Sequence, residues 1–128
     1  MKKVLLLDDD SAQLSVRQLL LQRMGGIESE TVTAATAALA LLRSEHGKAS
    51  IGVVVTDHVM PDMAGPEFVR EVRSFNRHIP VVVVSGLPDA DTEYDGLDTT
   101  FLMKPCEPSD LIAIIKDALD GNRSRASA

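Results

Sequence analysis

Polar side chains follow four largely apolar runs of this 128-residue chain, at the point where each run ends. The runs cover residues 4–7, 51–56, 81–84 and 101–103. The residues that follow them are Asp8, Asp9 and Asp10, then Asp57, then Ser85, then Lys104. Such groups converge only if the runs are strands lying parallel in one sheet, where ligands bind outside the carboxyl ends. The pattern therefore predicts one site that contains carboxylates, a hydroxyl and an ammonium group.

These groups suit the chemistry of Mg²⁺ and phosphoryl groups. Two carboxylates about 4 Å apart repel each other by roughly 4 kcal/mol at an effective dielectric constant of about 20. A divalent cation removes this repulsion, and oxygen ligands without His or Cys favour Mg²⁺ over zinc. We interpret Asp8 and Asp9 as metal holders and Asp57, a single acid ending an apolar central strand, as a nucleophile toward phosphorus. Lys104 and Ser85 would neutralise and hydrogen-bond the phosphoryl oxygens.

Each of these residues also has a purely structural interpretation. Asp10 and Ser11 stand where a helix should begin, so we interpret Asp10 mainly as a helix-start residue and Ser11 as a candidate cap. A lone aspartate at a strand end is more often a turn residue than a nucleophile. The order of the whole set favours the chemical interpretation. The three histidines are interpreted as surface residues: His46, His58 and His78.

The elements that must position these groups alternate between strand and helix. We expect strands at 4–7, 28–33, 51–56, 81–84 and 100–103, with the polar second strand at a sheet edge. We expect helices at 12–24, 36–45, 65–75 and 108–119. The stretch 86–99 contains Pro88, Gly96 and several acids, which predicts a short or frayed helix there. The alternation predicts an α/β fold, a doubly wound parallel sheet of five strands with five helices. Within the first helix, Arg17 is expected on the solvent-facing side.

The composition limits the class of protein. A hydrophobic content of 45% with 25% charged residues is typical of a soluble globular chain, and we assign one domain to residues 1–120 and a disordered polar tail to 121–128. The net charge of −6 argues against direct binding to nucleic acid, which requires a basic face. The single cysteine, Cys106, cannot form an internal disulfide, which favours a cytoplasmic location. No apolar run approaches about 18 residues, so we expect no membrane span.

Four motifs in this order resemble those of a bacterial response-regulator receiver domain, over residues 3–119. The motifs are LLLDDD at 5–10, VVTDHVMPDMAG at 54–65, VVSG at 83–86 and FLMKP at 101–105. The resemblance implies the strand order 2-1-3-4-5. It also implies a cytoplasmic phosphoacceptor of a two-component phosphorelay, which is a signalling protein and not an enzyme that acts on a separate substrate.

The resemblance further implies the roles of individual residues. Asp57 would accept a phosphoryl group from a sensor histidine kinase or a histidine phosphotransfer protein. Asp9, Asp57 and the backbone carbonyl of Val59 would bind Mg²⁺, with Asp8 assisting through water. Ser85 and Lys104 would hold the phosphoryl oxygens.

The same resemblance implies a switch and a backbone feature. Phe101 stands at the aromatic switch position, where it would rotate into space that Ser85 vacates. The Lys104–Pro105 bond would be cis. The resemblance leaves the downstream protein and a phosphorylation-dependent homodimer open.

The chain departs from the family pattern at several positions. Ala64 stands where the family usually has Asp or Asn, so the helix at 65–75 lacks a side-chain cap. Cys106 replaces the more common Phe, and the span from Ser85 to Lys104 is shorter than usual, which predicts an atypical output surface. Val59 and Leu87 are apolar at positions that tune hydrolysis of the acyl phosphate. Because they cannot orient water, we expect slow autodephosphorylation.

Two alternatives stay open at this point. A haloacid-dehalogenase-type phosphatase also has an Asp-x-Asp motif after its first strand, although Ala12 stands where that family has Thr or Val and the chain lacks room for a substrate cap. A receiver that binds partners without being phosphorylated is the second. Mg²⁺-dependent labelling distinguishes them, because a receiver would be labelled at Asp57 and a phosphatase at Asp8.

Overall fold

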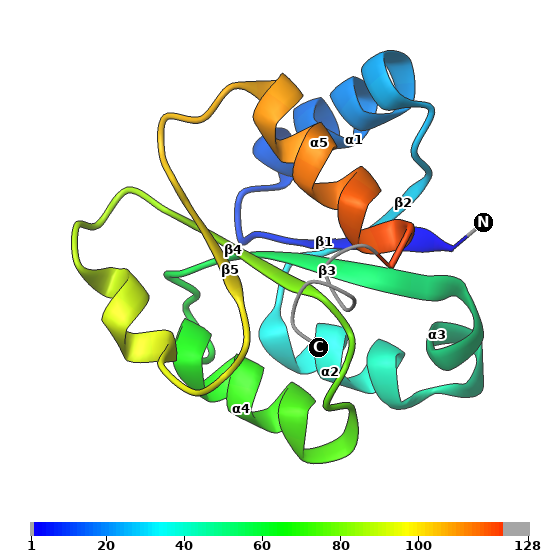
Figure 1. The fold of residues 1–128 in the computed structure, drawn as a ribbon. Coiled ribbons are helices and arrows are strands. Elements are labelled where there is room, and N and C mark those ends of the chain that lie inside the picture. The colour runs from blue at the N-terminus through cyan, green and yellow to red at the C-terminus, as the bar shows by residue number, and fades with distance from the viewer. Residues whose placement is uncertain (1, 122–128) are drawn as a thin grey trace.

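The computed structural model describes residues 2–121, which form a five-stranded parallel sheet covered by helices on both faces (Figure 1). The strand order is β2-β1-β3-β4-β5, as predicted. The strands are β1 (Lys3–Leu7), β2 (Ser29–Val32), β3 (Ile51–Asp57), β4 (Val81–Ser85) and β5 (Thr100–Met103). The helices are α1 (Ser11–Gly25), α2 (Ala35–Arg43), α3 (Glu45–Ser50), α4 (Gly65–Phe75), the 3-10 helix η1 (Ala90–Tyr94) and α5 (Pro108–Leu119).

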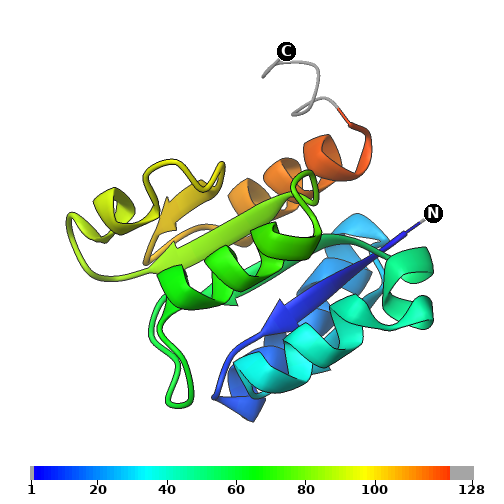
Figure 2. The same ribbon diagram turned by 90° about the horizontal axis from the view of Figure 1, so that it is seen from below.

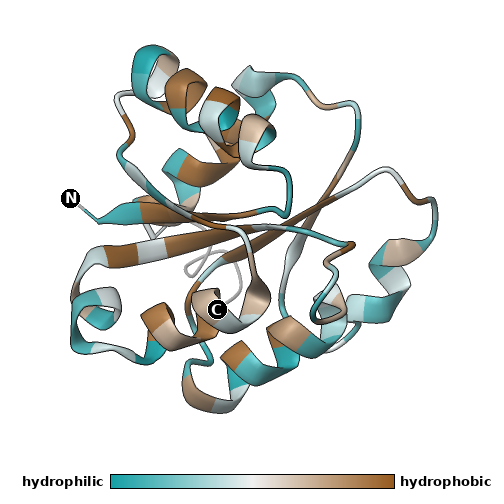
Figure 3. Ribbon diagram, turned by 180° about the vertical axis from the view of Figure 1, so that it is seen from behind, coloured by the Kyte–Doolittle hydropathy of each residue, from teal (hydrophilic) through white to brown (hydrophobic). Residues whose placement is uncertain are grey.

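The two faces of the sheet carry separate hydrophobic cores. Alternate residues of a strand point to opposite faces, so Val4 and Leu6 pack with α1 and α5, whereas Leu5 and Leu7 pack with α2 and α4. Figure 2 shows α2 and α4 together on the near side of the sheet, and Figure 3 shows hydrophobic residues concentrated on the strands and inner helix faces. Both faces are covered, which explains why the central strands are continuous apolar runs.

The edge position of β2 is confirmed. It pairs only with β1 in the sheet and is the most polar strand, with no fully buried residue. The central strand β3 is buried along most of its length because it lies between β1 and β4. The carboxyl ends of β1, β3, β4 and β5 therefore meet at one edge of the sheet, as the sequence predicted.

The connection between β2 and β3 differs from the prediction. The expected helix at 36–45 ends at Arg43, and a separate short helix, α3, follows it. The Ser44 hydroxyl accepts a hydrogen bond from the Gly47 amide at 3.0 Å and so caps α3. Gly47 is buried against the Leu41 carbonyl, which a Cβ at this position would overlap. This cap and close approach between neighbouring turns explain the break.

The start of α1 is set by Asp10. Its carboxylate accepts hydrogen bonds from the amides of Ala12 and Gln13, at 3.0 and 3.2 Å. The structural interpretation of Asp10 is confirmed, and the expectation that Ser11 caps the helix was wrong, since Ser11 lies inside it.

The segment between β4 and β5 has one short 3-10 helix, which confirms the expected short or atypical element. Arg73 of α4 holds the end of this segment, donating to the carbonyls of Leu97 and Asp98 at 2.8 and 2.9 Å. The segment is thus supported by side-chain bonds from α4 instead of by a helical ladder.

The last helix, α5, has the predicted bounds, and Leu111, Ile112 and Ile115 are buried. The predicted tail at 121–128 lies outside the described residues apart from Gly121. None of the helices between residues 2 and 121 is long and apolar enough to cross a membrane.

Candidate functional site

Three carboxylates converge at the carboxyl edge of the sheet. Strands β1 and β3 are neighbours with Leu7 opposite Thr56, so Asp8 and Asp9 emerge beside Asp57. One carboxylate oxygen from each of the three acids lies within 4.8 Å of the others. Asp8 is buried, Asp57 is partly exposed and Asp9 is exposed. The convergence that the sequence predicted is therefore present.

The carboxylate of Asp8 is only half satisfied. Its Oδ1 accepts a hydrogen bond from the Asp10 amide at 3.0 Å. Its Oδ2 is buried and has no hydrogen-bond partner among the described residues. Burial raises the pKa of Asp8 above its ordinary value, and the negative charge of Asp57 acts in the same direction, although the Asp10 amide and Arg17 oppose them. A buried acceptor without a donor, beside two further carboxylates, is a suitable ligand for a hard divalent cation.

Lys104 reaches the same acids from the end of β5. Its Nζ lies 3.0 Å from Asp57 Oδ1, and its backbone amide donates to the Ser85 carbonyl at 2.8 Å. The Lys104–Pro105 peptide is cis, as the resemblance implied. Asp57 is thus the carboxylate that lies close both to the other two acids and to the ammonium group of Lys104.

Ser85 lies at the end of β4, next to the Asp57 strand. The register places Val84 opposite Asp57. The serine side chain is buried, and its Oγ accepts a hydrogen bond from the Leu87 amide at 3.0 Å. Among the described hydrogen bonds this hydroxyl acts only as an acceptor, so its own proton is available for a further partner.

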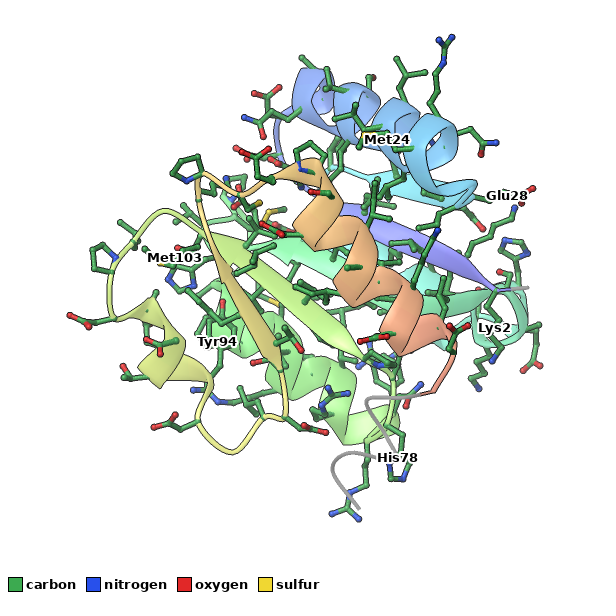
Figure 4. All side chains as sticks on the ribbon, turned by 45° about the horizontal axis from the view of Figure 1, so that its top comes forward. Lys2, Met24, Glu28, His78, Tyr94 and Met103 are labelled. Atoms are coloured by element: carbon green, nitrogen blue, oxygen red, sulfur yellow. The ribbon has the colours of Figure 1, made fainter. Side chains whose placement is uncertain are left out.

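Three exposed apolar residues lie close in sequence to the residues of this site. Val59 and Leu87, each two residues after Asp57 or Ser85, are 62% and 50% exposed, and Met103, directly before Lys104, is 45% exposed. Figure 4 shows Met103 near the end of β5. We call Val59, Leu87 and Met103 the apolar rim.

The prediction for His58 was wrong, because this residue is buried. Its Nδ1 forms a 2.6 Å hydrogen bond with the Tyr94 hydroxyl, and its Nε2 lies 3.5 Å from the Glu93 carboxylate. Tyr94 is buried between η1 and the sheet (Figure 4) and packs against Phe101 with ring centroids 6.1 Å apart. Gly65 leaves room for the phenol, which a Cβ there would overlap. The residue after Asp57 is therefore tied to η1 and, through Tyr94, to Phe101.

The other two histidines and Phe101 differ in their exposure. His46 and His78 are exposed, as expected. His46 Nε2 lies 2.9 Å from Glu30. Phe101 is partly buried and packs against the core between the sheet and helices α2 and α4.

Two further contacts outside the predicted set, those of Asp62 and Arg17, were missed or misjudged from the sequence. The Asp62 carboxylate accepts hydrogen bonds from the amides of Ala35 and Thr36, at 3.2 and 3.1 Å, and so caps α2 from the loop after β3. These bonds, with the Thr36 amide first, lower the pKa of Asp62. Arg17, expected on the solvent-facing side of α1, has a side chain only 15% exposed that lies against Asp8. No local sequence pattern could reveal either contact.

Comparisons with known proteins agree with this arrangement. The sequence matches the family model of the response regulator receiver domain over residues 4–116. The chain is 31% identical over 117 residues to the two-component response regulator ORR12 of Oryza sativa subsp. japonica, a match that spans 88% of this chain and 93% of that protein. It is 32% identical over 123 residues to the probable transcriptional regulator ycf27 of Cyanophora paradoxa, of which it spans 48%. The chain thus covers about half of some curated relatives and most of others.

Solved structures of similar fold include receiver domains. The response regulator receiver domain protein from Clostridium thermocellum is 30% identical with a TM-score of 0.83, over 100% of both chains. The CheY-like receiver domain protein from Methanospirillum hungatei JF-1 is 26% identical with a TM-score of 0.84, over 98% of both chains.

Proposed function

This chain belongs to the response regulator receiver domain family, and on that premise we propose that it is a phosphoacceptor of a two-component phosphorelay. Asp57 would take the phosphoryl group from a phosphohistidine of a sensor histidine kinase or a histidine phosphotransfer protein. The observation that carries this proposal is the position of Asp57. It is a member of the three-carboxylate cluster and also lies 3.0 Å from the Lys104 ammonium.

The metal in this proposal is Mg²⁺. Asp8, Asp9 and Asp57 would hold it together with the backbone carbonyl of Val59. The all-oxygen ligand set and the orphaned Oδ2 of Asp8 support this assignment. When bound, the ion would neutralise charge that develops on the phosphoryl oxygens.

Asp57, Lys104 and Ser85 would have different roles in the phosphoryl transfer. A carboxylate oxygen of Asp57 forms the bond to phosphorus as the bond from phosphorus to the donor imidazole nitrogen breaks, and the nitrogen keeps the electron pair. Lys104 would exchange its contact with Asp57 for one with a phosphoryl oxygen. The Ser85 hydroxyl would donate its uncommitted proton to another phosphoryl oxygen.

The movement of Ser85 would change the preferred orientation of the Phe101 side chain. Phe101 would rotate into the space that Ser85 vacates, and its contact with Tyr94 would pass the change to η1. The surface formed by η1, β5 and α5 would then bind a downstream protein or a second copy of the chain. Because η1 is a single short 3-10 helix, this surface would differ from one built on a full helix.

The apolar rim bears on the lifetime of the phosphoryl group. Val59 and Leu87 have no group that could orient an attacking water molecule, so autodephosphorylation would be slow. The chain would act as a cytoplasmic signalling phosphoacceptor that catalyses its own phosphorylation and slow dephosphorylation. It would not act directly on nucleic acid, because its net charge is −6.

The test is intact mass after incubation with acetyl phosphate, with and without Mg²⁺. One Mg²⁺-dependent phosphoryl adduct is expected in the wild type and none in Asp57→Asn. An adduct that maps to Asp8 would support the phosphatase alternative. Absence of an adduct from both acetyl phosphate and a phosphorylated histidine donor, despite measurable Mg²⁺ binding, would overturn the phosphoacceptor proposal in favour of a phosphorylation-independent binding module.

A further inference from the structure

An arginine lies beside the acidic cluster, and one of its terminal nitrogens has no hydrogen-bond partner among the described residues. Arg17 is on the second turn of α1, and its Nη1 lies 3.9 Å from Asp8 Oδ2. Both atoms are buried, and neither has a hydrogen-bond partner among the described residues. The separation is an ion-pair distance but too long for a direct hydrogen bond. Two buried groups of opposite charge thus face each other, and each has an atom without a hydrogen bond.

The surroundings of the Arg17 side chain are largely apolar. Its side chain lines the apolar groove between α1 and α5, together with Leu21, Cys106 and Leu111. Only 15% of the side chain is exposed. Burying a guanidinium group costs free energy unless a negative charge compensates it. Asp8 is the acid that does so here.

The two cations of the site differ in their freedom to move. Lys104 contacts Asp57 through a long flexible stem and is 35% exposed, so it can follow the phosphoryl group. Arg17 is more deeply buried and lies against Asp8, which is itself a predicted metal ligand. A divalent cation that enters the cluster is repelled by the positive charge of Arg17, and burial reduces the screening of that repulsion by salt.

We propose that Arg17 is a built-in counter-cation of the acidic cluster. It compensates Asp8 while the metal is absent and weakens Mg²⁺ binding, so it sets the metal concentration at which the site fills. Arg17 is a positioning residue in this scheme and does not touch the phosphoryl group. The inference rests on the proposed function only in that Mg²⁺ binds to Asp8, Asp9 and Asp57.

The experiment is isothermal titration calorimetry, in which MgCl₂ is added to the full chain without any phosphodonor. It measures the Kd for Mg²⁺. Arg17→Gln and Arg17→Met remove the charge, and the second keeps an apolar stem for the groove. Both are expected to lower the Kd for Mg²⁺ at least fivefold. Arg17→Lys keeps the charge and should stay within about twofold of the wild type.

Arg23→Gln is the matched control, because it removes the same charge from an exposed position on the same helix. Its Kd should stay within about twofold of the wild type. An unchanged or higher Kd in a folded Arg17→Gln or Arg17→Met protein would overturn the inference, and so would an equal decrease in Arg23→Gln. If neither neutral variant folds, an increase in Kd for Arg17→Lys beyond twofold would overturn it, and an unchanged Kd would support it. Failure of the wild type to bind Mg²⁺ would instead refute the metal site itself.

Discussion

The hydrogen bond between Tyr94 and His58 should make a measurable contribution to stability. Tyr94 is 3% exposed and His58 is 8% exposed, and their polar atoms are 2.6 Å apart. Burial raises the pKa of Tyr94 well above its ordinary value of 10.0, so the phenol keeps its proton at neutral pH and can donate to His58 Nδ1. Tyr94→Phe removes this donor but keeps the ring that packs on Phe101.

The magnitude follows from what remains after the substitution. The variant leaves a buried imidazole nitrogen without its partner, which costs about 1–3 kcal/mol. We therefore expect the free energy of unfolding to fall by about 1–3 kcal/mol. Urea denaturation followed by far-ultraviolet circular dichroism measures it, because the chain has no tryptophan and this variant has no tyrosine.

Matched variants separate the hydrogen bond from other effects. His78→Ala alters an exposed histidine and should leave the free energy of unfolding nearly unchanged. In a double-mutant cycle, His58→Phe and Tyr94→Phe together should cost less than the sum of the two single substitutions, because both remove one shared contact. A loss below about 0.5 kcal/mol for Tyr94→Phe, or strictly additive losses, would refute the reasoning.

Three further predictions concern the loop after β3. Asp62→Ala should lower the free energy of unfolding by about 0.5–1 kcal/mol at neutral pH, since Asp62 caps α2. The pKa of Asp62 in the folded state lies below 3.8, so its contribution to the free energy of unfolding is full above pH 3.8 and is lost as the pH falls through the folded-state pKa. Thermal unfolding of the wild type and Asp62→Ala should show the stability difference between them disappearing in that range. A difference that persists in strong acid would contradict this. Ala64→Asp should stabilise the protein by about 0.5–2 kcal/mol by capping α4, which has no side-chain cap, and a lower melting temperature would argue against it. Val59→Asn should speed loss of the phosphoryl group severalfold in a mass time course, whereas fast loss in the wild type would show that the apolar rim does not slow hydrolysis.

The chemistry-bearing residues could be found from the sequence because each one ends a local apolar run. Asp57 ends β3 and Lys104 directly follows β5, both strands are recognisable by composition alone, and parallel strands must bring their carboxyl ends to one edge. The alternation of strands and helices along the chain followed from the same local patterns, except for the separate short helix α3. The weak segment at 86–99 was also visible, since glycine, proline and acids there oppose a regular helix.

Contacts between distant segments were decided only by the tertiary structure. His58 and Tyr94 are 36 residues apart, and Asp62 caps a helix that begins 27 residues earlier. The burial of Arg17 against Asp8 depends on how α1 packs on α5 and the sheet. Local propensity and periodicity describe which face of an element is apolar, but they carry no information on which polar groups of different elements meet. That pairing is set by side-chain packing across the whole domain, so the acids of the site could be read from the sequence whereas the groups that surround and tune them could not.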